Sequence, residues 1–258
     1  MEKLANLYDY PRYYDLVFGS DWKAETDFLQ AVFDTHLKRQ VRRLFEPACG
    51  TGRLLFRLAK AGYEVSGLDL NPRAVDFCNQ RLVRHGLPAS VFVGDMSDFR
   101  LPAKIDAAFN TINSFRHLLS ERAARSHLQC VAAALRRGGV YVLGLHLTPT
   151  EGTPLDEERW SARRGHLGIN THLQTFDLDL EDRTERCRMT MDVYTPTRRF
   201  QIIDELVFRT YTAQQLKRLL AGVPELELAA TYDFQYRLDS PTEIEADTQD
   251  IVLILKKR

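Results

Sequence analysis

The segment EPACGTGR, residues 46–53, combines residue types that can hold a small ligand. An apolar run precedes it and residues with helical spacing follow it, so it predicts a strand, a glycine turn and a helix. Gly50 and Gly52 lack a Cβ and let the backbone approach a ligand closely, and free N–H groups at the start of the helix attract a negative group. The pattern indicates a carboxylate or phosphate at this turn, although a purely structural connection can have the same pattern.

The next two predicted strands also end in acidic residues. Asp69 follows the segment VSGL and can accept both hydroxyl groups of a ribose, its alternative role being a cap for the next helix. Asp95 and Met96 follow the third strand, where a carboxylate can accept an adenine amino group and a thioether can pack against the ring. The carboxyl ends of parallel strands meet at one edge of an open α/β sheet, where ligands bind. Together, the three strand ends predict a crevice for an amino-acid head, a ribose and an adenine.

These groups need a parallel sheet to position them, and short apolar runs that alternate with helical segments predict one between Arg42 and Leu145. We expect strands over 43–46, 64–70, 90–94, 105–110 and 140–145, and helices over 22–37, 53–61, 73–84 and 121–136, the last ending at Gly138-Gly139. Alternating residues predict an antiparallel meander over 168–211, then a helix over 213–220 and two strands, 226–232 and 251–256, that return to the main sheet. Residues 148–165 are expected to form a mobile loop.

Residues 8–145, with these motifs, resemble the class I S-adenosylmethionine-dependent methyltransferases whose first motif reads E/D-x-x-C-G-T-G-R. The resemblance implies an α/β, Rossmann-like methyltransferase fold with a mostly parallel seven-stranded sheet, helices on both faces and a small antiparallel β insertion. We expect an N-terminal helical lid over 1–40, a cofactor-binding core over 41–146 and 211–258, and an antiparallel β insertion over 147–210. The insertion would form a substrate roof or a dimer face.

The resemblance also implies a role for each residue of the crevice. Glu46 would organise the methionyl amine and Asp69 the ribose, while Leu70, Asp95 and Met96 would surround the adenine. The methionyl and ribose parts would be lined by main chain near Ala48, Gly50, Thr51, Gly52 and Asn110. Arg53 suits the methionyl carboxylate by charge, or else faces solvent. Tyr14 resembles a tyrosine that closes over the sulfonium in related enzymes, but Tyr8, Tyr10 or Tyr13 could fill that role, and a packing helix is the alternative.

The polar stretch NTINSFRHLLS, residues 110–120, follows the fourth strand and is expected to contact the methyl acceptor. His117 could remove a proton from the acceptor, or else be a packing histidine. Arg116 could hold a substrate carboxylate or phosphate, or else be solvated, and Asn113 is a further polar candidate. His146, at the end of the fifth strand, is a secondary candidate.

These observations predict methyl transfer from S-adenosylmethionine to a small molecule by in-line displacement, with S-adenosylhomocysteine as product and an amine favoured over a hydroxyl as acceptor. Lys+Arg and Asp+Glu both number 35, so no net field attracts nucleic acid or a membrane. Methylation of RNA and non-catalytic cofactor binding are the alternatives. A dinucleotide enzyme is disfavoured because Leu55 replaces the third glycine of its motif and because Glu46 would repel a pyrophosphate.

The four cysteines have no metal-ligand spacing, which predicts no metal site and no disulfide framework. The first residues lack the apolar stretch of a signal peptide, and no long apolar run follows. We therefore expect a cytoplasmic protein with no membrane partner, and the meander could form a homodimer.

Overall fold

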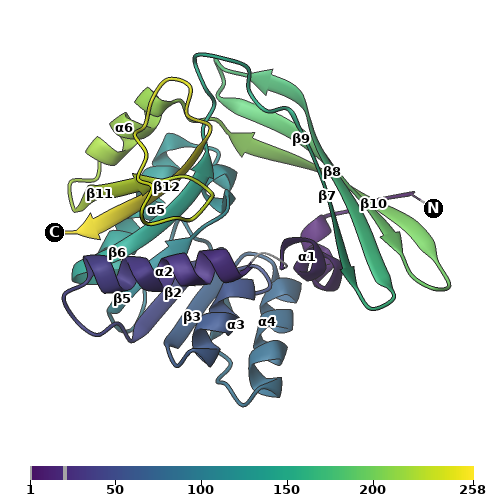
Figure 1. The fold of residues 1–258 in the computed structure, drawn as a ribbon, viewed down its shortest axis with the longest axis horizontal. Coiled ribbons are helices and arrows are strands. Elements are labelled where there is room, and N and C mark those ends of the chain that lie inside the picture. Colours follow the sequence, from purple (N-terminus) through teal and green to yellow (C-terminus); the bar gives the residue numbers. More distant parts are fainter. Residues whose placement is uncertain (1, 20–21) are drawn as a thin grey trace.

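The computed structural model describes residues 2–19 and 22–258. Met1, Ser20 and Asp21, which belong to the predicted lid over 1–40, lie outside the described residues. Figure 1 shows two β-sheets, of which the larger is covered by helices and the smaller projects to one side.

Most helices begin close to the positions that the sequence predicts. Side-chain oxygens of Asn71, Ser120 and Thr212 accept backbone N–H groups at the first turns of the helices that follow them, as expected for these cap residues. The helices are η1 (Leu7–Asp9), α1 (Pro11–Phe18), α2 (Trp22–His36), α3 (Arg53–Lys60), α4 (Pro72–Arg84), η2 (Ser114–His117), α5 (Glu121–Ala134) and α6 (Ala213–Ala221).

The larger sheet has seven strands in the order β11-β12-β6-β5-β2-β3-β4. They are β2 (Arg43–Pro47), β3 (Glu64–Asp69), β4 (Val91–Val93), β5 (Ile105–Asn110), β6 (Leu135–His146), β11 (Leu226–Tyr232) and β12 (Asp250–Lys257). Pairs among β2 to β6 are parallel, whereas β12 runs antiparallel to both β6 and β11. The predicted mostly parallel, seven-stranded sheet is confirmed.

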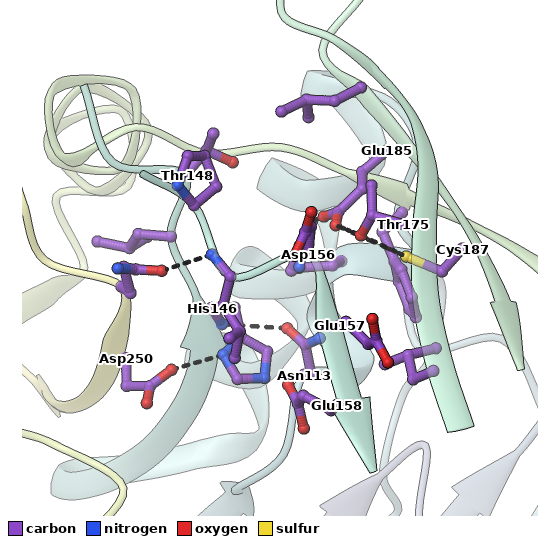
Figure 2. A pocket seen from close by; sticks show the side chains of 18 residues that line it. Asn113, His146, Thr148, Asp156, Glu157, Glu158, Thr175, Glu185, Cys187 and Asp250 are labelled. Carbon is purple, nitrogen blue, oxygen red and sulfur yellow. Dashed lines mark hydrogen bonds and ion pairs between the residues drawn. The ribbon is translucent and has the colours of Figure 1, made fainter. Parts of the chain in front are cut away.

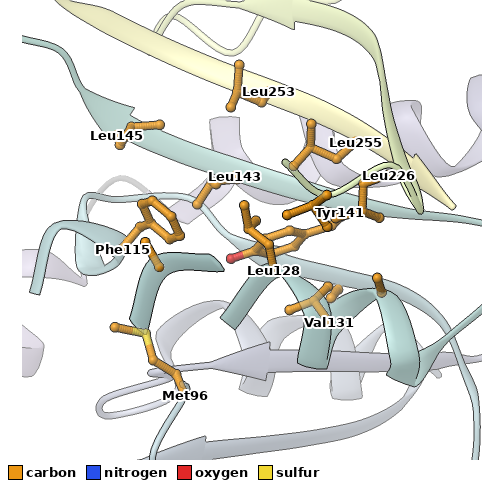
Figure 3. Packing of buried hydrophobic residues seen from close by; sticks show 14 of the residues in the cluster. Met96, Phe115, Leu128, Val131, Tyr141, Leu143, Leu145, Leu226, Leu253 and Leu255 are labelled. Atoms are coloured by element: carbon orange, nitrogen blue, oxygen red, sulfur yellow. The ribbon is translucent and has the colours of Figure 1, made fainter. Parts of the chain in front are cut away.

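Side chains of the central strands alternate between two cores. Tyr141, Leu143 and Leu145 of β6 join α5 and α6 on one face, as Figure 3 shows for these strand residues and α5. Val140 and Val142 point to the other face, which α2 and α3 cover, with α4 beside them. Burial on both faces explains why these strands read as nearly continuous apolar runs. Because the sheet is fixed from both sides, its carboxyl edge is a rigid platform for a site.

A buried histidine also ties the sheet to the end of β4. His127 of α5 bonds the Tyr141 hydroxyl through Nε2 at 2.8 Å and the Met96 carbonyl through Nδ1 at 2.8 Å. Burial lowers the pKa of His127 to about 4, so the ring is neutral at pH 7. His127 therefore contributes to positioning Met96 rather than to proton transfer.

The smaller sheet has the strand order β1-β10-β9-β8-β7. The strands are β1 (Glu2–Leu4), β7 (Glu157–Arg164), β8 (Leu167–Asp179), β9 (Thr184–Tyr194) and β10 (Arg199–Arg209). Strands β7 to β10 are antiparallel, which confirms the predicted antiparallel extension, and β1 joins it in parallel with β10. The division of the chain into lid, core and insertion stays a prediction.

Two local predictions were wrong. The expected loop over 148–165 contains β7, whose sequence EERWSARR is too polar to stand out but pairs with β8 along its whole length. The helix expected to end at Gly138-Gly139 ends at Ala134, and β6 begins directly at Leu135. Gly139 instead allows close strand packing, because a Cβ there would lie 2.7 Å from the Asp106 carbonyl oxygen.

Helix α1 lies at the junction of the two sheets, where it contacts β7, β8 and α4 (Figure 1). Its buried Asp15 accepts a hydrogen bond from Thr51 at 3.1 Å and pairs with Arg81 of α4 and Arg164 of β7. The N-terminal segment is thereby fastened to the glycine turn. In the described part of the chain, no helix is long and apolar enough to cross a membrane.

Candidate active site

The glycine turn between β2 and α3 has three residues with positive φ: Ala48 (53°), Gly50 (53°) and Gly52 (67°). A Cβ at Gly52 would lie 2.2 Å from the sulfur of Cys78 on α4, so only glycine fits there. The Gly52 N–H donates to the Cys49 carbonyl at 2.8 Å, which closes the turn. The backbone between β2 and α3 therefore forms the glycine turn that the sequence predicts.

Asp69 at the end of β3 is drawn against this turn. One carboxylate oxygen accepts the Gly50 N–H at 2.8 Å and the other accepts the Asn71 N–H at 2.9 Å. Burial raises the pKa of Asp69, and the two backbone hydrogen bonds act in the opposite direction. The first and second strand ends thus meet, as predicted.

Glu46 and Asn110 carry buried polar atoms without a partner. Glu46 Oε2 and Asn110 Oδ1 both lack a hydrogen bond to any described residue, whereas Asn110 Nδ2 donates to the Pro47 carbonyl at 2.7 Å. Burial raises the pKa of Glu46 well above its usual range, and the positive charge of nearby Arg53 acts to lower that pKa. A buried oxygen without a hydrogen bond costs folding free energy. Two such oxygens beside the glycine turn therefore suit a ligand that donates hydrogen bonds to them. A methionyl ammonium supplies such a donor, and these residues therefore suit S-adenosylmethionine.

Tyr14 is the N-terminal tyrosine that reaches the turn. Its ring carbon Cε1 lies 3.6 Å from the position of a Cβ at Gly50. Its ring also contacts Tyr8, with centroids 5.2 Å apart, while Tyr13 packs against Phe200 of the smaller sheet. Burial raises the pKa of Tyr14, so the hydroxyl stays neutral. Tyr14 therefore contacts the glycine turn, and its closure over a bound cofactor stays a prediction.

Arg53 has a partner that sequence reasoning missed. Its guanidinium binds both carboxylate oxygens of Glu25, at 2.6 and 2.7 Å, and Glu25 also accepts the Thr111 hydroxyl. The ion pair joins α2, α3 and the end of β5, and its charges cancel. Arg53 is neither solvent-facing nor an unmatched charge. The sequence feature that could have revealed this pair is Glu25, an acidic residue on the buried side of the amphipathic helix α2.

The expected adenine region has an apolar surface. Leu70 is 68% exposed and Val93 is 56% exposed at the ends of β3 and β4, beside the buried Met96. Asp95 is exposed, and its carboxylate accepts the Ser97 N–H at 2.7 Å, which leaves the second oxygen without a described partner. Exposed large apolar side chains beside a free carboxylate oxygen suit a flat base with an amino group.

The polar stretch after β5 forms the short helix η2, and its three candidates are held by protein groups. Asn113 has φ 54°, and its Oδ1 accepts the His146 backbone N–H at 3.1 Å. Arg116 is buried, donates to the Arg209 carbonyl at 2.9 Å and pairs with Glu185. Arg116 is therefore not solvated, and its charge is already matched.

His117 contacts the N-terminal segment. Its Nε2 lies 3.0 Å from the Tyr8 hydroxyl, and its ring packs against Phe208 with centroids 4.9 Å apart. Burial, with Arg116 nearby, lowers the pKa of His117 to about 4. The imidazole is neutral at pH 7 and only weakly basic. The structure thus connects Tyr14, Tyr8 and His117 in one contact series from the glycine turn to η2.

A cavity of about 300 Å³ opens between the carboxyl ends of β5 and β6 and the strands of the smaller sheet. Figure 2 shows His146 in its wall, with Asp250 on one side and side chains of β7 to β9 opposite. Its titratable lining residues include Arg116, His146, Asp156, Glu157, Glu158, Glu185 and Asp250. Carboxylates therefore dominate. Sequence reasoning named Arg116 and His146 but missed the carboxylates, three of which lie at 156–158, where a loop was expected.

No group of three or more His, Cys, Asp or Glu side chains within residues 2–19 and 22–258 is placed to hold a metal ion.

A seven-stranded sheet with one antiparallel strand, a glycine turn after its first core strand and acids on the next strand tips define a Rossmann-like methyltransferase fold. Residues 45–139 match the family model described as a methyltransferase domain. A putative methyltransferase of Geobacillus sp. (strain WCH70) is 23% identical over 260 residues, covering 100% of this chain and 99% of that protein.

Two further relatives agree. The dTDP-3-amino-3,6-dideoxy-alpha-D-glucopyranose N,N-dimethyltransferase of Streptomyces fradiae is 31% identical over 144 residues, covering 55% of this chain and 54% of the relative. An S-adenosylmethionine-dependent methyltransferase structure from Clostridium acetobutylicum ATCC 824 superposes with a TM-score of 0.78 at 17% identity, covering 98% of this chain and 99% of that one. Residues 45–139 thus form a methyltransferase domain, and the chain as a whole has the fold of the S-adenosylmethionine-dependent methyltransferases.

Proposed function

We propose that the chain transfers the methyl group of S-adenosylmethionine to the nitrogen of a small-molecule amine. The observation that carries this proposal is the charge of the cavity beside β5 and β6. Glu185 neutralises Arg116, so Asp156, Glu158 and Asp250 leave the cavity with an excess of negative charge. A cavity of one sign favours ligands of the opposite sign. An ammonium acceptor fits this cavity, whereas an acceptor with a phosphate or carboxylate near the reacting atom is repelled.

The residues of the two regions have different proposed tasks. Glu46, Asp69, Asp95 and the turn would hold the cofactor, which supplies an electrophilic methyl group on a sulfonium. The chain itself then has to align a nucleophile and exclude water. Asn113 would position the end of β6, Arg116 would fix Glu185 in the cavity wall, and His117 with Tyr8 would close the edge between the regions.

The named activity of the Streptomyces fradiae relative is N-methylation of an amino sugar nucleotide, which supports an amine acceptor. A zero net charge and an acidic cavity speak against a polyanionic substrate such as RNA. A homodimer through the smaller sheet and a cytoplasmic location stay predictions.

The test is turnover of matched acceptor pairs. Purified chain and S-adenosylmethionine are incubated with amines and their hydroxyl counterparts, for example glucosamine with glucose and a dTDP-linked 3-amino sugar with its 3-hydroxy analogue. S-adenosylhomocysteine is measured by mass spectrometry. We expect product with at least one amine and at most a tenth of that rate with its hydroxyl partner. Equal or faster turnover of hydroxyl acceptors, turnover of tRNA alone, or cofactor binding without turnover of any acceptor would contradict the proposal.

A cavity variant sharpens this test. Glu158→Gln is expected to raise KM for a cationic amine about threefold to tenfold, because it removes one carboxylate from the lining. Glu151→Gln, at an exposed position outside that lining, is the matched control and should leave KM unchanged. An unchanged KM in Glu158→Gln would place the acceptor elsewhere.

A further inference from the structure

The structure assigns His146, held by Asp250, as the base that removes a proton from the acceptor ammonium; this inference rests on the proposed amine methylation. An ammonium has no free electron pair and cannot attack a methyl group, so an acceptor that arrives charged needs a base. The acidic cavity selects the charged form of the amine and thereby creates this need.

Two contacts hold the imidazole of His146, and a third holds its backbone. His146 ends β6 and is the direct cross-strand partner of Asp250 on β12, and its Nδ1 lies 2.6 Å from an Asp250 oxygen. Its backbone N–H donates to Asn113 Oδ1 at 3.1 Å. Its ring meets the ring of Phe234 edge-on, with centroids 5.1 Å apart. A base placed on a rigid strand and oriented by a carboxylate is the arrangement that proton transfer requires.

The Asp250 contact decides which ring nitrogen is free. An ionised carboxylate only accepts hydrogen bonds, so Nδ1 carries the hydrogen and Nε2 keeps its electron pair. No described residue bonds to Nε2, and the side chain, which is 31% exposed, lines the cavity (Figure 2). In contrast, His117 Nε2 is engaged by Tyr8, and both nitrogens of His127 are bonded. His146 Nε2 is therefore a ring nitrogen without a described partner, on a side chain that lines the cavity.

The N–H bond of the acceptor ammonium breaks, its electron pair stays on the amine nitrogen, and the proton bonds to His146 Nε2. The neutral amine takes the methyl group and becomes a methylammonium, so one proton is released to solvent when the imidazolium deprotonates. Asp156 and Glu158 line the same cavity and Asp250 adjoins the ring, so negative charge lies beside the nitrogen that takes up the proton. Arg116, the one guanidinium in the described lining, is matched by Glu185.

The first experiment needs no acceptor and reads the tautomer directly. Full-length chain labelled with ¹⁵N at histidine is studied by two-dimensional NMR, with His146→Asn to assign the resonances. We expect the Nδ1–H tautomer for His146 in the neutral range, and loss of this preference in Asp250→Asn. A predominant Nε2–H tautomer in the wild type would overturn the assignment, because the electron pair would then face Asp250.

The second experiment measures turnover of the panel amine that the wild type methylates fastest. His146→Asn is expected to lower kcat about 100-fold, a common effect of removing a general base, with an unchanged Kd for S-adenosylmethionine. The loss should shrink as the pH approaches the pKa of the amine, because free amine needs no base. Asp250→Asn should show a smaller loss with the same pH trend. Exposed His85 provides the control variant His85→Asn, which should match the wild type.

The outcomes separate the two proposals. If the wild type methylates only hydroxyl acceptors, the proposed amine methylation fails whatever the tautomer is. If the wild type methylates amines and His146→Asn keeps its kcat, the role of His146 is overturned while the proposed function stands. A large loss in His117→Asn together with none in His146→Asn would assign the base to His117.

Discussion

Glu46→Gln is expected to weaken S-adenosylmethionine binding about 100-fold, as is typical when one partner of a buried ion pair is removed. Glu46 is buried beside the glycine turn, and its Oε2 has no hydrogen-bond partner in the part of the chain that the structure describes. The amide keeps the size of the side chain but loses the negative charge that a methionyl ammonium needs. Isothermal titration calorimetry with S-adenosylmethionine measures the effect.

The same substitution is expected to stabilise the free chain at neutral and alkaline pH. Burial raises the folded pKa of Glu46 above its ordinary value of 4.5, so the folded chain binds more protons than the unfolded chain above that pH. The free energy of unfolding of the wild type therefore falls as pH rises from about 4.5 through the folded pKa. Glu46→Gln removes this fall.

Urea unfolding at pH 5 and pH 8 without cofactor tests the stability effect. The difference between wild type and Glu46→Gln should grow with pH, whereas Glu181→Gln, in an exposed turn, should behave like the wild type. Tighter cofactor binding in Glu46→Gln, or a loss of stability that grows with pH, would contradict our assignment of this residue.

Gly52→Ala is expected to abolish measurable binding of S-adenosylmethionine. The new Cβ would lie 2.2 Å from Cys78 Sγ, at a residue with φ 67°, so the turn must move away from α4. Gly62→Ala is the matched control, because Gly62 also has positive φ, 98°, but a Cβ there meets no atom of the described residues within 4 Å. Both variants carry a backbone strain of about 1–2 kcal/mol. They differ because only Gly52→Ala brings a Cβ against Cys78 and only Gly52 lies in the glycine turn.

A second substitution separates the collision from the strain. Cys78→Ala removes the sulfur, so Gly52→Ala with Cys78→Ala should regain part of the binding that Gly52→Ala loses. Calorimetry compares cofactor binding by Gly52→Ala, Gly62→Ala, Cys78→Ala and the double variant, and circular dichroism verifies that each is folded. Equal loss of binding in Gly52→Ala and Gly62→Ala would mean that strain alone matters and that the turn has no special role.

Much of the core was predictable from the sequence, because burial on both faces leaves a clear apolar pattern. Strands β5 and β11 lie within the bounds predicted for them, and the ends of β2 and β3 differ by one residue. The polar strand β7 was not predictable, because its place in the smaller sheet depends on pairing with β8 rather than on burial. Strand β1 was missed for a similar reason: it pairs with β10, about 200 residues later in the chain.

For the site, the residues next to the glycine turn were predictable, because local motifs set their positions. The Asp69 contact with the Gly50 N–H follows from two strand ends that meet at one edge. The partners of Arg53 and His146 were not predictable, because Glu25 and Asp250 lie far away in the sequence and are brought in by packing. The acidic cavity requires both sheets to be in place, and a local pattern cannot show it.

The most direct test of the central claim is a crystal structure of the chain with S-adenosylmethionine. We predict the methionyl ammonium within hydrogen-bond distance of Glu46 and the ribose hydroxyls on the Asp69 carboxylate, with Tyr14 over the sulfonium. A crevice that stays empty at saturating cofactor, or cofactor bound away from the glycine turn, would contradict the account.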